Sequence, residues 1–296
     1  MSTAQTQERP PRPAGLPATA PARRSGAGRQ RLVRGLLVAA ALAYVLVLLL
    51  GPLAGLIYYA FNQGLGVLGQ TFSQPDALHA FYLTFLIMVV TVAVTTVFGV
   101  LVALLMARDR FPGKRLVSAL VDLPLAVSPV IVGLMAVLLF GRGGWFAAFL
   151  AAHGVQVIFA LPSMILVTIF ISIPFTIREV VPVLQELGLE EEQAAWTLGA
   201  SKTQTFFKVT LPNIRWGLLY GIALSAARAI GEVGAVLIVS GAVEGKTETA
   251  TLFILRLFDQ GHYQQGYIVA LTLAAFSIVL LIGIETFKRK RTREAR

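Results

Sequence analysis

Two opposite charges, Arg228 and Glu232, lie inside an apolar segment of this chain. They are four residues apart, so on an α-helix they share one face and can form an ion pair. An ionisable side chain in a membrane span costs about 2.5 to 3.5 kcal/mol on insertion scales, so it marks a candidate functional site. Two roles fit: an internal ion pair that fixes helix packing, or part of a substrate path. In a path for an oxyanion, Arg228 would attract the anion and Glu232 would hold Arg228 or weaken binding enough for release.

A second candidate lies in another apolar segment, at Ser128 and Pro129. Proline removes a backbone hydrogen bond, so the freed backbone groups can face a path, although a simple kink also explains the proline. Asp122 is a weaker candidate, because Lys114 and Arg115 lie close in sequence and suit the start of a helix at the membrane interface. The candidate residues for a substrate path are therefore Arg228, Glu232 and Ser128.

A polar island, QELGLEEEQAAWTLGASKTQTFFKVTLPN, interrupts the apolar sequence at residues 185–213. Its three glutamates, 190–192, suit the first turn of a helix, where the macrodipole favours acids. Gly199 is predicted to end this helix, Ser201 to cap a second short helix, and Pro212 to end that one. The pattern predicts a compact knob of two helices joined by a glycine bend.

The elements that position these residues are predicted membrane helices. The chain is 56% hydrophobic and 14% charged, whereas soluble domains are about 25% charged. Crossing a bilayer takes about 20 apolar residues, and the stretches that satisfy this run near 35–61, 79–107, 116–141, 157–178, 214–240 and 267–287. Prolines and charges interrupt the third, fourth and fifth of them, which favours a packed bundle over isolated anchors. The first is too long for the core of a signal peptide and is predicted to be retained.

Lys and Arg residues predict the orientation of these spans. Of the 25 in the chain, 21 lie in the two tails, in 108–115, or in the island with its flanks. Cations concentrate on the cytoplasmic side, so both termini and the island are predicted to be cytoplasmic. The net charge of +10 thus reflects topology in a lipid membrane and does not indicate nucleic-acid binding.

The predicted organisation has three parts. Residues 1–33 are rich in Pro, Ala and Arg, which is typical of a disordered basic cytoplasmic tail. Residues 34–288 form a transmembrane domain that carries the loop 185–213. Residues 289–296 form a second basic cytoplasmic tail.

The sequence lacks the residues that several kinds of chemistry require. The chain has no cysteine, and its three histidines, His79, His153 and His262, have no metal-ligand spacing. The stretch 240–247, SGAVEGKT, has Ser240 where a phosphate loop requires its first glycine. We therefore predict that the chain has no catalytic, cofactor or metal site of its own.

The island resembles the EAA loop of binding-protein-dependent importer permeases, with Gln193 and Val209 standing for the usual Glu and Ile. In that family the loop forms coupling helices that seat in a groove of an ATPase subunit. The resemblance implies coupling roles for Gln193, Ala194, Ala195, Gly199, Ala200, Ser201, Leu211 and Pro212. Glu192 precedes the substituted position by one residue. The alternative, a helix lying on the membrane surface, would prefer a basic polar face, and this helix begins with three acids.

Longer stretches resemble the sulfate and thiosulfate importer permeases of the CysW type over residues 35 to about 288. They are DLPLAVSPVIVGL, LVTIFISIPFTIREVVPVL, VTLPNIRWGLLYGIALSAARAIGEVGAVLIVSG and EGKTETATL. The resemblance implies an all-α, polytopic membrane protein of the type I (MetI-like) architecture, with about six spans and both termini inside, in a bacterial inner membrane.

The same resemblance implies partners. They are two copies of a cytoplasmic subunit that binds ATP and Mg, a related permease of the CysT type, and a periplasmic sulfate- or thiosulfate-binding protein. The loops around 142–156 and 241–266 are predicted to face that binding protein. Molybdate and tungstate permeases share the element Arg-Ala-Ile-Gly-Glu and remain an alternative. A self-contained secondary anion transporter, with Arg228 and Glu232 as relay groups, is an alternative of another class.

Overall fold

The computed structural model describes residues 26–62, 64 and 66–294, and its regular elements over these residues are all helical. Most of the predicted amino-terminal tail, residues 1–25, lies outside the described part of the chain. The chain divides into two compact units, residues 1–53 and 54–296. Helix α1 (Gly26–Phe61) begins before the predicted boundary at residue 33. Residues 26–33 are therefore helical and do not belong to a disordered tail, because Gln, Arg and Leu are good helix formers next to a long apolar helix.

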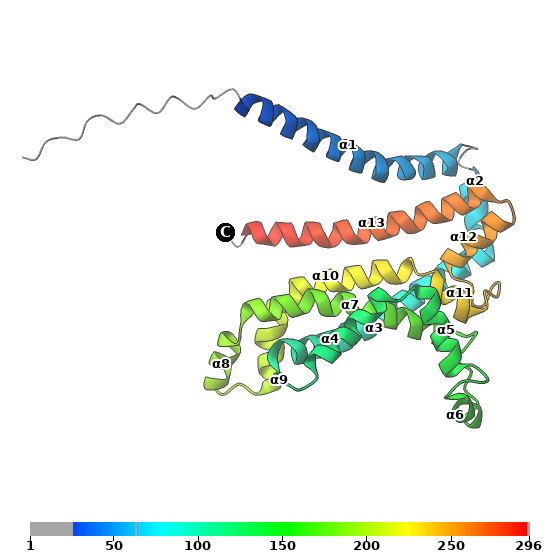
Figure 1. Cartoon of the computed structure of the whole chain (residues 1–296). Helices are drawn as coiled ribbons and strands as arrows, with labels where there is room; N and C mark the ends of the chain where they lie inside the picture. The colour runs from blue at the N-terminus through cyan, green and yellow to red at the C-terminus, as the bar shows by residue number, and fades with distance from the viewer. Residues whose placement is uncertain (1–25, 63, 65, 295–296) are drawn as a thin grey trace, which may run out of the picture. The chain divides into compact units, whose positions relative to one another are not determined.

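The second unit contains, after the last turns of α1, the remaining helices (Figure 1). They are α2 (Gly66–Phe72), α3 (Pro75–Arg108), α4 (Lys114–Ala126), α5 (Pro129–Phe140), α6 (Ala147–Ala152), α7 (Leu161–Leu187), α8 (Glu190–Thr197), α9 (Lys202–Thr205), the π-helix η1 (Phe206–Thr210), α10 (Leu211–Ile230), α11 (Gly234–Ser240), α12 (Ala250–Asp259) and α13 (Tyr263–Glu294).

The described helices give four to six candidate membrane spans. Within α1, α3, α7 and α13, the segments that are long and apolar enough are Val33–Phe61, Pro75–Arg108, Leu161–Leu187 and Tyr263–Gly283. Two further pairs qualify as bent spans: α4 with α5, bent by 111°, and the helix Lys202–Ile230 with α11, bent by 54°. Counting each pair as one span gives the six predicted spans, in the predicted order.

Each bend lies where the sequence carries an interruption. Pro129 cannot donate a backbone hydrogen bond, and it drives the preceding residue out of the helical region. Ser128 accordingly has φ −60° and ψ 137°. The other bend follows Arg228, and α10 ends at Ile230 before a short non-helical segment that contains Glu232.

Helices α3, α7 and α10 form the core that carries the candidate sites. Glycines let them approach closely: a Cβ atom on Gly221 of α10 would lie 2.9 Å from the Cα atom of Thr176 on α7. Buried hydroxyls add polar links, because the Thr176 and Ser225 oxygens are 3.0 Å apart and Ser225 Oγ also donates to the Ser172 carbonyl. Small residues and buried hydroxyls are the usual means by which helices associate in a membrane.

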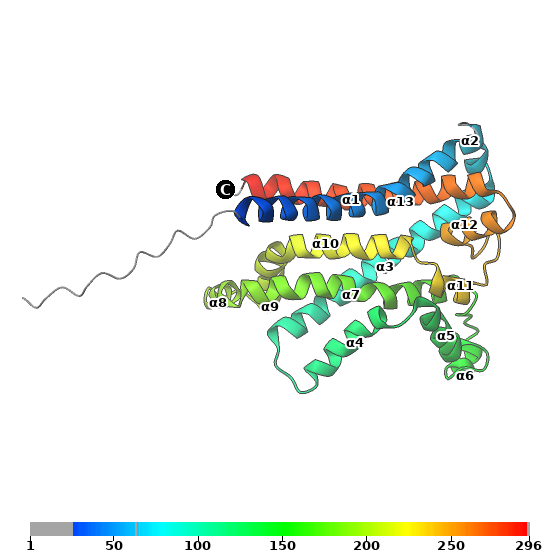
Figure 2. The same ribbon diagram turned by 45° about the horizontal axis from the view of Figure 1, so that its top comes forward.

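The ends of this core differ in character. Figures 1 and 2 show α8, α9 and the start of α4 at one end, and α5, α6, α11 and α12 at the opposite end. The first end carries the segments 108–115 and 185–213, which the Lys and Arg distribution predicts to be cytoplasmic. We call it the cytoplasmic end and the other the external end. Helices α2, α6 and α12 lie in segments for which the sequence predicted only external loops.

Candidate functional site

The polar island folds as the predicted knob, which we define as residues 188–213. Helix α8 begins with the three glutamates, and Gly199, with φ +86°, reverses the chain after it. Ser201 caps α9 in a capping box: its N–H donates to Gln204 Oε1 at 2.9 Å, and its Oγ accepts from the Gln204 N–H at 3.3 Å. The predicted glycine bend and the predicted cap are both present.

The prediction that Pro212 ends the second helix is wrong. The helix runs without a break from Lys202 to Ile230, and η1 makes this possible. Its wider turn allows the Leu211 N–H to donate a hydrogen bond to the Phe206 carbonyl, five residues earlier. A π-turn relieves the clash that a proline ring makes with the carbonyl four residues before it. The knob is therefore continuous with α10.

A buried ion pair anchors α8 to the end of α3. Arg108 Nη2 lies 2.9 Å from Glu192 Oε1, and the two side chains are 15% and 11% exposed. Thr210 Oγ1 donates to the same carboxylate oxygen at 2.9 Å, and Arg108 Nη1 donates to the Leu184 carbonyl at 3.0 Å. The sequence marks Glu192 only as the glutamate one residue before the substituted motif position. It does not indicate that Arg108 is its partner, because 84 residues separate the two.

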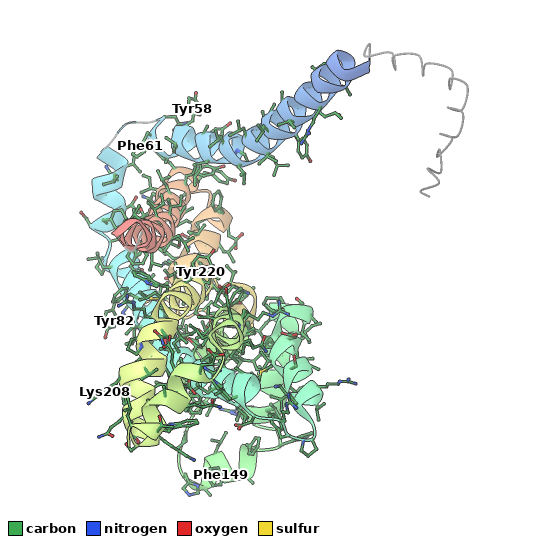
Figure 3. The ribbon with its side chains drawn as sticks, turned by 90° about the vertical axis from the view of Figure 1, so that its left-hand side faces the viewer. Tyr58, Phe61, Tyr82, Phe149, Lys208 and Tyr220 are labelled. Atoms are coloured by element: carbon green, nitrogen blue, oxygen red, sulfur yellow. The ribbon has the colours of Figure 1, made fainter. Side chains whose placement is uncertain are left out.

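The outer surface of the knob is apolar at its tip. Leu198 is 88% exposed, and Phe207 and Trp196 are also exposed. Figure 3 views this end and shows Lys208 pointing outward. Of the predicted coupling residues, five are exposed and three are half-buried. The exposed ones are Gln193, Ala194, Gly199, Ser201 and Pro212, and the half-buried ones are Ala195, Ala200 and Leu211. Large exposed apolar side chains on a water-facing knob are typical of a protein interface.

Arg228 and Glu232 form the predicted ion pair at the bend of the fifth span. Arg228 Nη1 lies 2.7 Å from Glu232 Oε2, and their side chains are 28% and 2% exposed. The other oxygen, Oε1, accepts from the Ala235 N–H at 2.8 Å, so the carboxylate also caps the first turn of α11. Glu232 thus has a structural role, while the Arg228 side chain remains partly accessible.

The bends of the third and fifth spans pack against each other. A Cβ atom on Gly234 would lie 3.1 Å from Pro129 Cβ, and one on Gly133 would lie 2.8 Å from Ile238 Cβ. Ser128 is exposed at this junction. The predicted path residues therefore belong to two helix interruptions that meet, which no local feature of the sequence indicates.

One arginine organises the external end. Arg256 donates from Nε and Nη2 to the two carboxylate oxygens of Glu248 at 2.8 and 2.9 Å. Glu244 and Asp76 lie 3.1 and 3.7 Å from the same guanidinium. Burial raises the pKa of Glu248, and the Arg256 charge opposes this rise. The Arg256 guanidinium is therefore held by carboxylates of its own chain.

Residues 96–292 match the family described as binding-protein-dependent transport system inner membrane component. The chain belongs to this family. The permease is 43% identical over 258 residues to the sulfate transport system permease protein CysW of Synechocystis sp., covering 87% of this chain and 94% of the relative. It is 35% identical over 246 residues to CysT of the same organism, covering 83% and 86%.

A solved structure shares the permease's fold. It is the crystal structure of a bacterial alginate ABC transporter in complex with an alginate pentasaccharide-bound periplasmic protein. The TM-score is 0.74 at 20% identity, over 90% of this chain and 96% of that one. The predicted all-α permease architecture is confirmed, and the permease is a multi-pass membrane protein.

Proposed function

We propose that this permease moves sulfate or thiosulfate across a bacterial inner membrane, as one of two membrane subunits of an ATP-driven importer. The observation that carries the proposal is the 43% identity to a CysW protein over nearly its whole length. The 35% identity to a CysT protein supports a second, related permease as its partner. A soluble periplasmic protein would deliver the anion to the external end, as suggested by the periplasmic protein in the alginate transporter structure.

Two ATP-binding subunits, which hold ATP and Mg, would grip the knob. Its exposed apolar tip, centred on Leu198, is the surface that a groove on such a subunit would cover. The Glu192–Arg108 pair ties α8 to α3, and the unbroken helix from Lys202 ties the knob to α10. A displacement of the knob would therefore pass to two core helices, because packed elements shift between discrete arrangements and do not deform smoothly.

Within the membrane, Arg228 is the proposed contact for the anion. A guanidinium pairs well with an oxyanion through two parallel hydrogen bonds. Glu232 holds one side of this guanidinium, so it would position Arg228 and keep anion binding weak enough for release. Ser128 lies at the adjoining bend and would offer a hydroxyl to the same path.

Reconstituted uptake tests the proposed function. The permease, its CysT-type partner, the ATP-binding subunit and the binding protein are purified together and placed in vesicles with labelled sulfate. We expect uptake that requires ATP and the binding protein, that thiosulfate inhibits, and that molybdate and tungstate do not. Inhibition by molybdate at equal concentration would favour the molybdate alternative. ATP-independent uptake by this chain alone would favour a secondary transporter.

The role of Arg228 is tested separately in the same vesicles. Arg228→Ala is expected to reduce uptake at least tenfold, while Arg228→Lys retains part of it, because a lysine keeps the charge but loses the bidentate geometry. Unchanged uptake by Arg228→Ala in an assembled importer would overturn direct anion contact and leave the substrate assignment standing.

A further inference from the structure

A second ion pair lies on the membrane helices, between Arg178 of α7 and Asp122 of α4. Arg178 Nη2 and Nε both lie 2.9 Å from Asp122 Oδ1. Arg178 precedes the end of α7 at Leu187 by nine residues, which corresponds to about 13 Å along the helix. From the sequence, Arg178 counts among the cations that flank the island, and no partner is predicted for Asp122.

This pair is exposed, with the side chains 56% and 44% accessible. An exposed ion pair contributes little to folding stability, so stability does not explain two charges on membrane helices. Ionisable residues within spans face the bundle interior or a water-filled cavity, and they avoid lipid. The surface shared by α4 and α7 therefore faces water or another subunit in the membrane.

A cleft of about 660 Å³ opens on the cytoplasmic side of the same surface. Its lining includes Lys114, Arg115 and Ser118 on α4, and Val181 and Gln185 on α7. Residues three or four apart share a helix face. Ser118 is four residues before Asp122, and Val181 is three residues after Arg178, so the lining continues along both helices to the ion pair.

The mouth of the cleft is positively charged. Over the part of the chain that the structure describes, no carboxylate lies within ion-pair distance of Lys114 or Arg115. Lys114 Nζ donates to the Asp109 carbonyl at 3.2 Å, and Arg115 is exposed. The lining thus combines the cations Lys114 and Arg115 with the Ser118 hydroxyl and the Gln185 amide, a set of groups that suits a hydrated oxyanion.

We propose that this cleft is the cytoplasmic exit vestibule for the transported oxyanion and that the Arg178–Asp122 pair is its gate. The inference rests on the proposed function. When the gate is closed, Asp122 neutralises the Arg178 guanidinium. When α7 moves relative to α4, the guanidinium is freed to bind the anion by donating paired hydrogen bonds to its oxygens. The Asp122 carboxylate repels the anion and so promotes its release toward Lys114 and Arg115.

The coupling to the knob follows from the chain path. Helix α7 leads directly into α8 through Gly188, and α8 is held by the buried Glu192–Arg108 pair. A movement of the knob would therefore act on the helix that carries Arg178. The gate would respond to the ATP-binding subunits without any contact with nucleotide.

Accessibility of a single cysteine tests the vestibule, because the natural chain contains none. Ser118→Cys in the assembled importer is treated with a negatively charged thiol reagent from the cytoplasmic side. We expect the reagent to label this cysteine. We also expect the labelling to become several-fold slower while the importer is transporting sulfate. The matched control is Leu116→Cys, which is exposed on α4 but does not line the cleft. The vestibule proposal would be overturned if Ser118→Cys is not labelled. It would also be overturned if sulfate affects the labelling of Ser118→Cys no more than that of Leu116→Cys.

Removing one charge tests the gate. Asp122→Asn is expected to lower the maximal uptake rate at least fivefold and to lower the half-saturating concentration, because an unopposed Arg178 retains the anion. The charge-swapped variant Asp122→Arg/Arg178→Asp is expected to recover uptake above that of either single swap. Glu186→Gln, which neutralises an exposed carboxylate on α7, is the control and is expected to transport normally.

The outcomes separate the two proposals. If the unmodified importer does not take up sulfate, the proposed function fails. If it does, and Asp122→Asn transports at the unmodified rate, the gate alone fails. A swapped variant no better than its single swaps would equally refute the pairing as the functional element.

Discussion

The cytoplasmic and external ends of the permease are both organised by one arginine with a buried carboxylate, but the surroundings differ. Arg108 meets a single acidic partner, Glu192, and both side chains are nearly buried. Arg256 meets three carboxylates, of which only Glu248 is buried. The cytoplasmic pair is therefore electrically balanced, whereas the external cluster keeps an excess of negative charge.

The two arrangements leave different surfaces for partners. At the cytoplasmic end the charges are inside and the tip of the knob is apolar, with Leu198 almost fully exposed. At the external end the loop closes on itself, since Thr247 Oγ1 donates to the Ser240 carbonyl at 2.7 Å. The apolar tip suits the proposed contact with an ATP-binding subunit. The external end is a closed, acidic cluster that is unsuited to binding an anion directly.

The largest effect is expected from Arg108→Ala. This change leaves the Glu192 carboxylate buried without its cation, which typically costs about 3 to 5 kcal/mol. The unfolding temperature of the purified permease in detergent should fall sharply, and transport should be lost. Arg110→Ala, which removes an exposed cation in the same loop, is the control. Equal stability of the two variants would show that the pair does not anchor the knob.

Arg256→Ala should cost less, about 2 to 3 kcal/mol at neutral pH, because two of its three carboxylates remain in water. The sign of the pH dependence follows from Glu248, whose pKa burial already raises. Without Arg256 that pKa rises further, so the folded state binds a proton more readily than the unfolded state. The loss of stability is therefore greatest above the raised pKa and shrinks as the pH falls through it toward the ordinary value of 4.5.

A thermal unfolding series across this pH range checks the prediction. Adding Glu248→Gln to Arg256→Ala should remove most of the pH dependence, because the buried carboxylate is gone. A loss of stability that does not vary with pH in Arg256→Ala would contradict the assignment of Glu248.

Gly199→Val should cost about 1 to 2 kcal/mol, since a β-branched residue is strained at φ +86°. No atom lies within 4 Å of the added Cβ position, so the strain is in the backbone alone. We expect a reshaped knob and reduced retention of the ATP-binding subunit during purification. Gly199→Asn, which tolerates this conformation, is the control, and unimpaired ATP-driven transport by Gly199→Val would refute a coupling role for the bend.

The smallest effect on stability is expected from Leu198→Ser. An exposed side chain that touches little should change the unfolding free energy by less than about 0.5 kcal/mol. Binding of the ATP-binding subunit should nevertheless weaken, because the apolar contact is lost. Val243→Ser, an exposed apolar residue at the external end, is the control. Equal subunit retention by both variants would contradict the docking surface.

Much of the fold was predictable because it depends on hydropathy. A long apolar stretch must form a helix in a bilayer, and prolines mark where such helices bend. The bend at Ser128 is therefore visible in the sequence. The short helices α2, α6 and α12 were missed, because helices of ten residues or fewer are marginal alone and depend on tertiary packing. Phe253 and Leu257 of α12, for example, are buried against α3 and α13.

The sequence by itself determined the local features of the knob, since caps and turns depend on residues a few positions apart. The glutamates of α8, the reversal at Gly199 and the cap at Ser201 are of this kind. Only the tertiary structure decided which charges meet: Arg108 with Glu192, and Arg178 with Asp122, across 84 and 56 residues. Such pairs are set by how the helices cross and not by the residues beside them. The tertiary structure therefore also decides their burial, which distinguishes the buried Arg108–Glu192 pair that anchors the knob from the exposed Arg178–Asp122 pair that we propose as a gate.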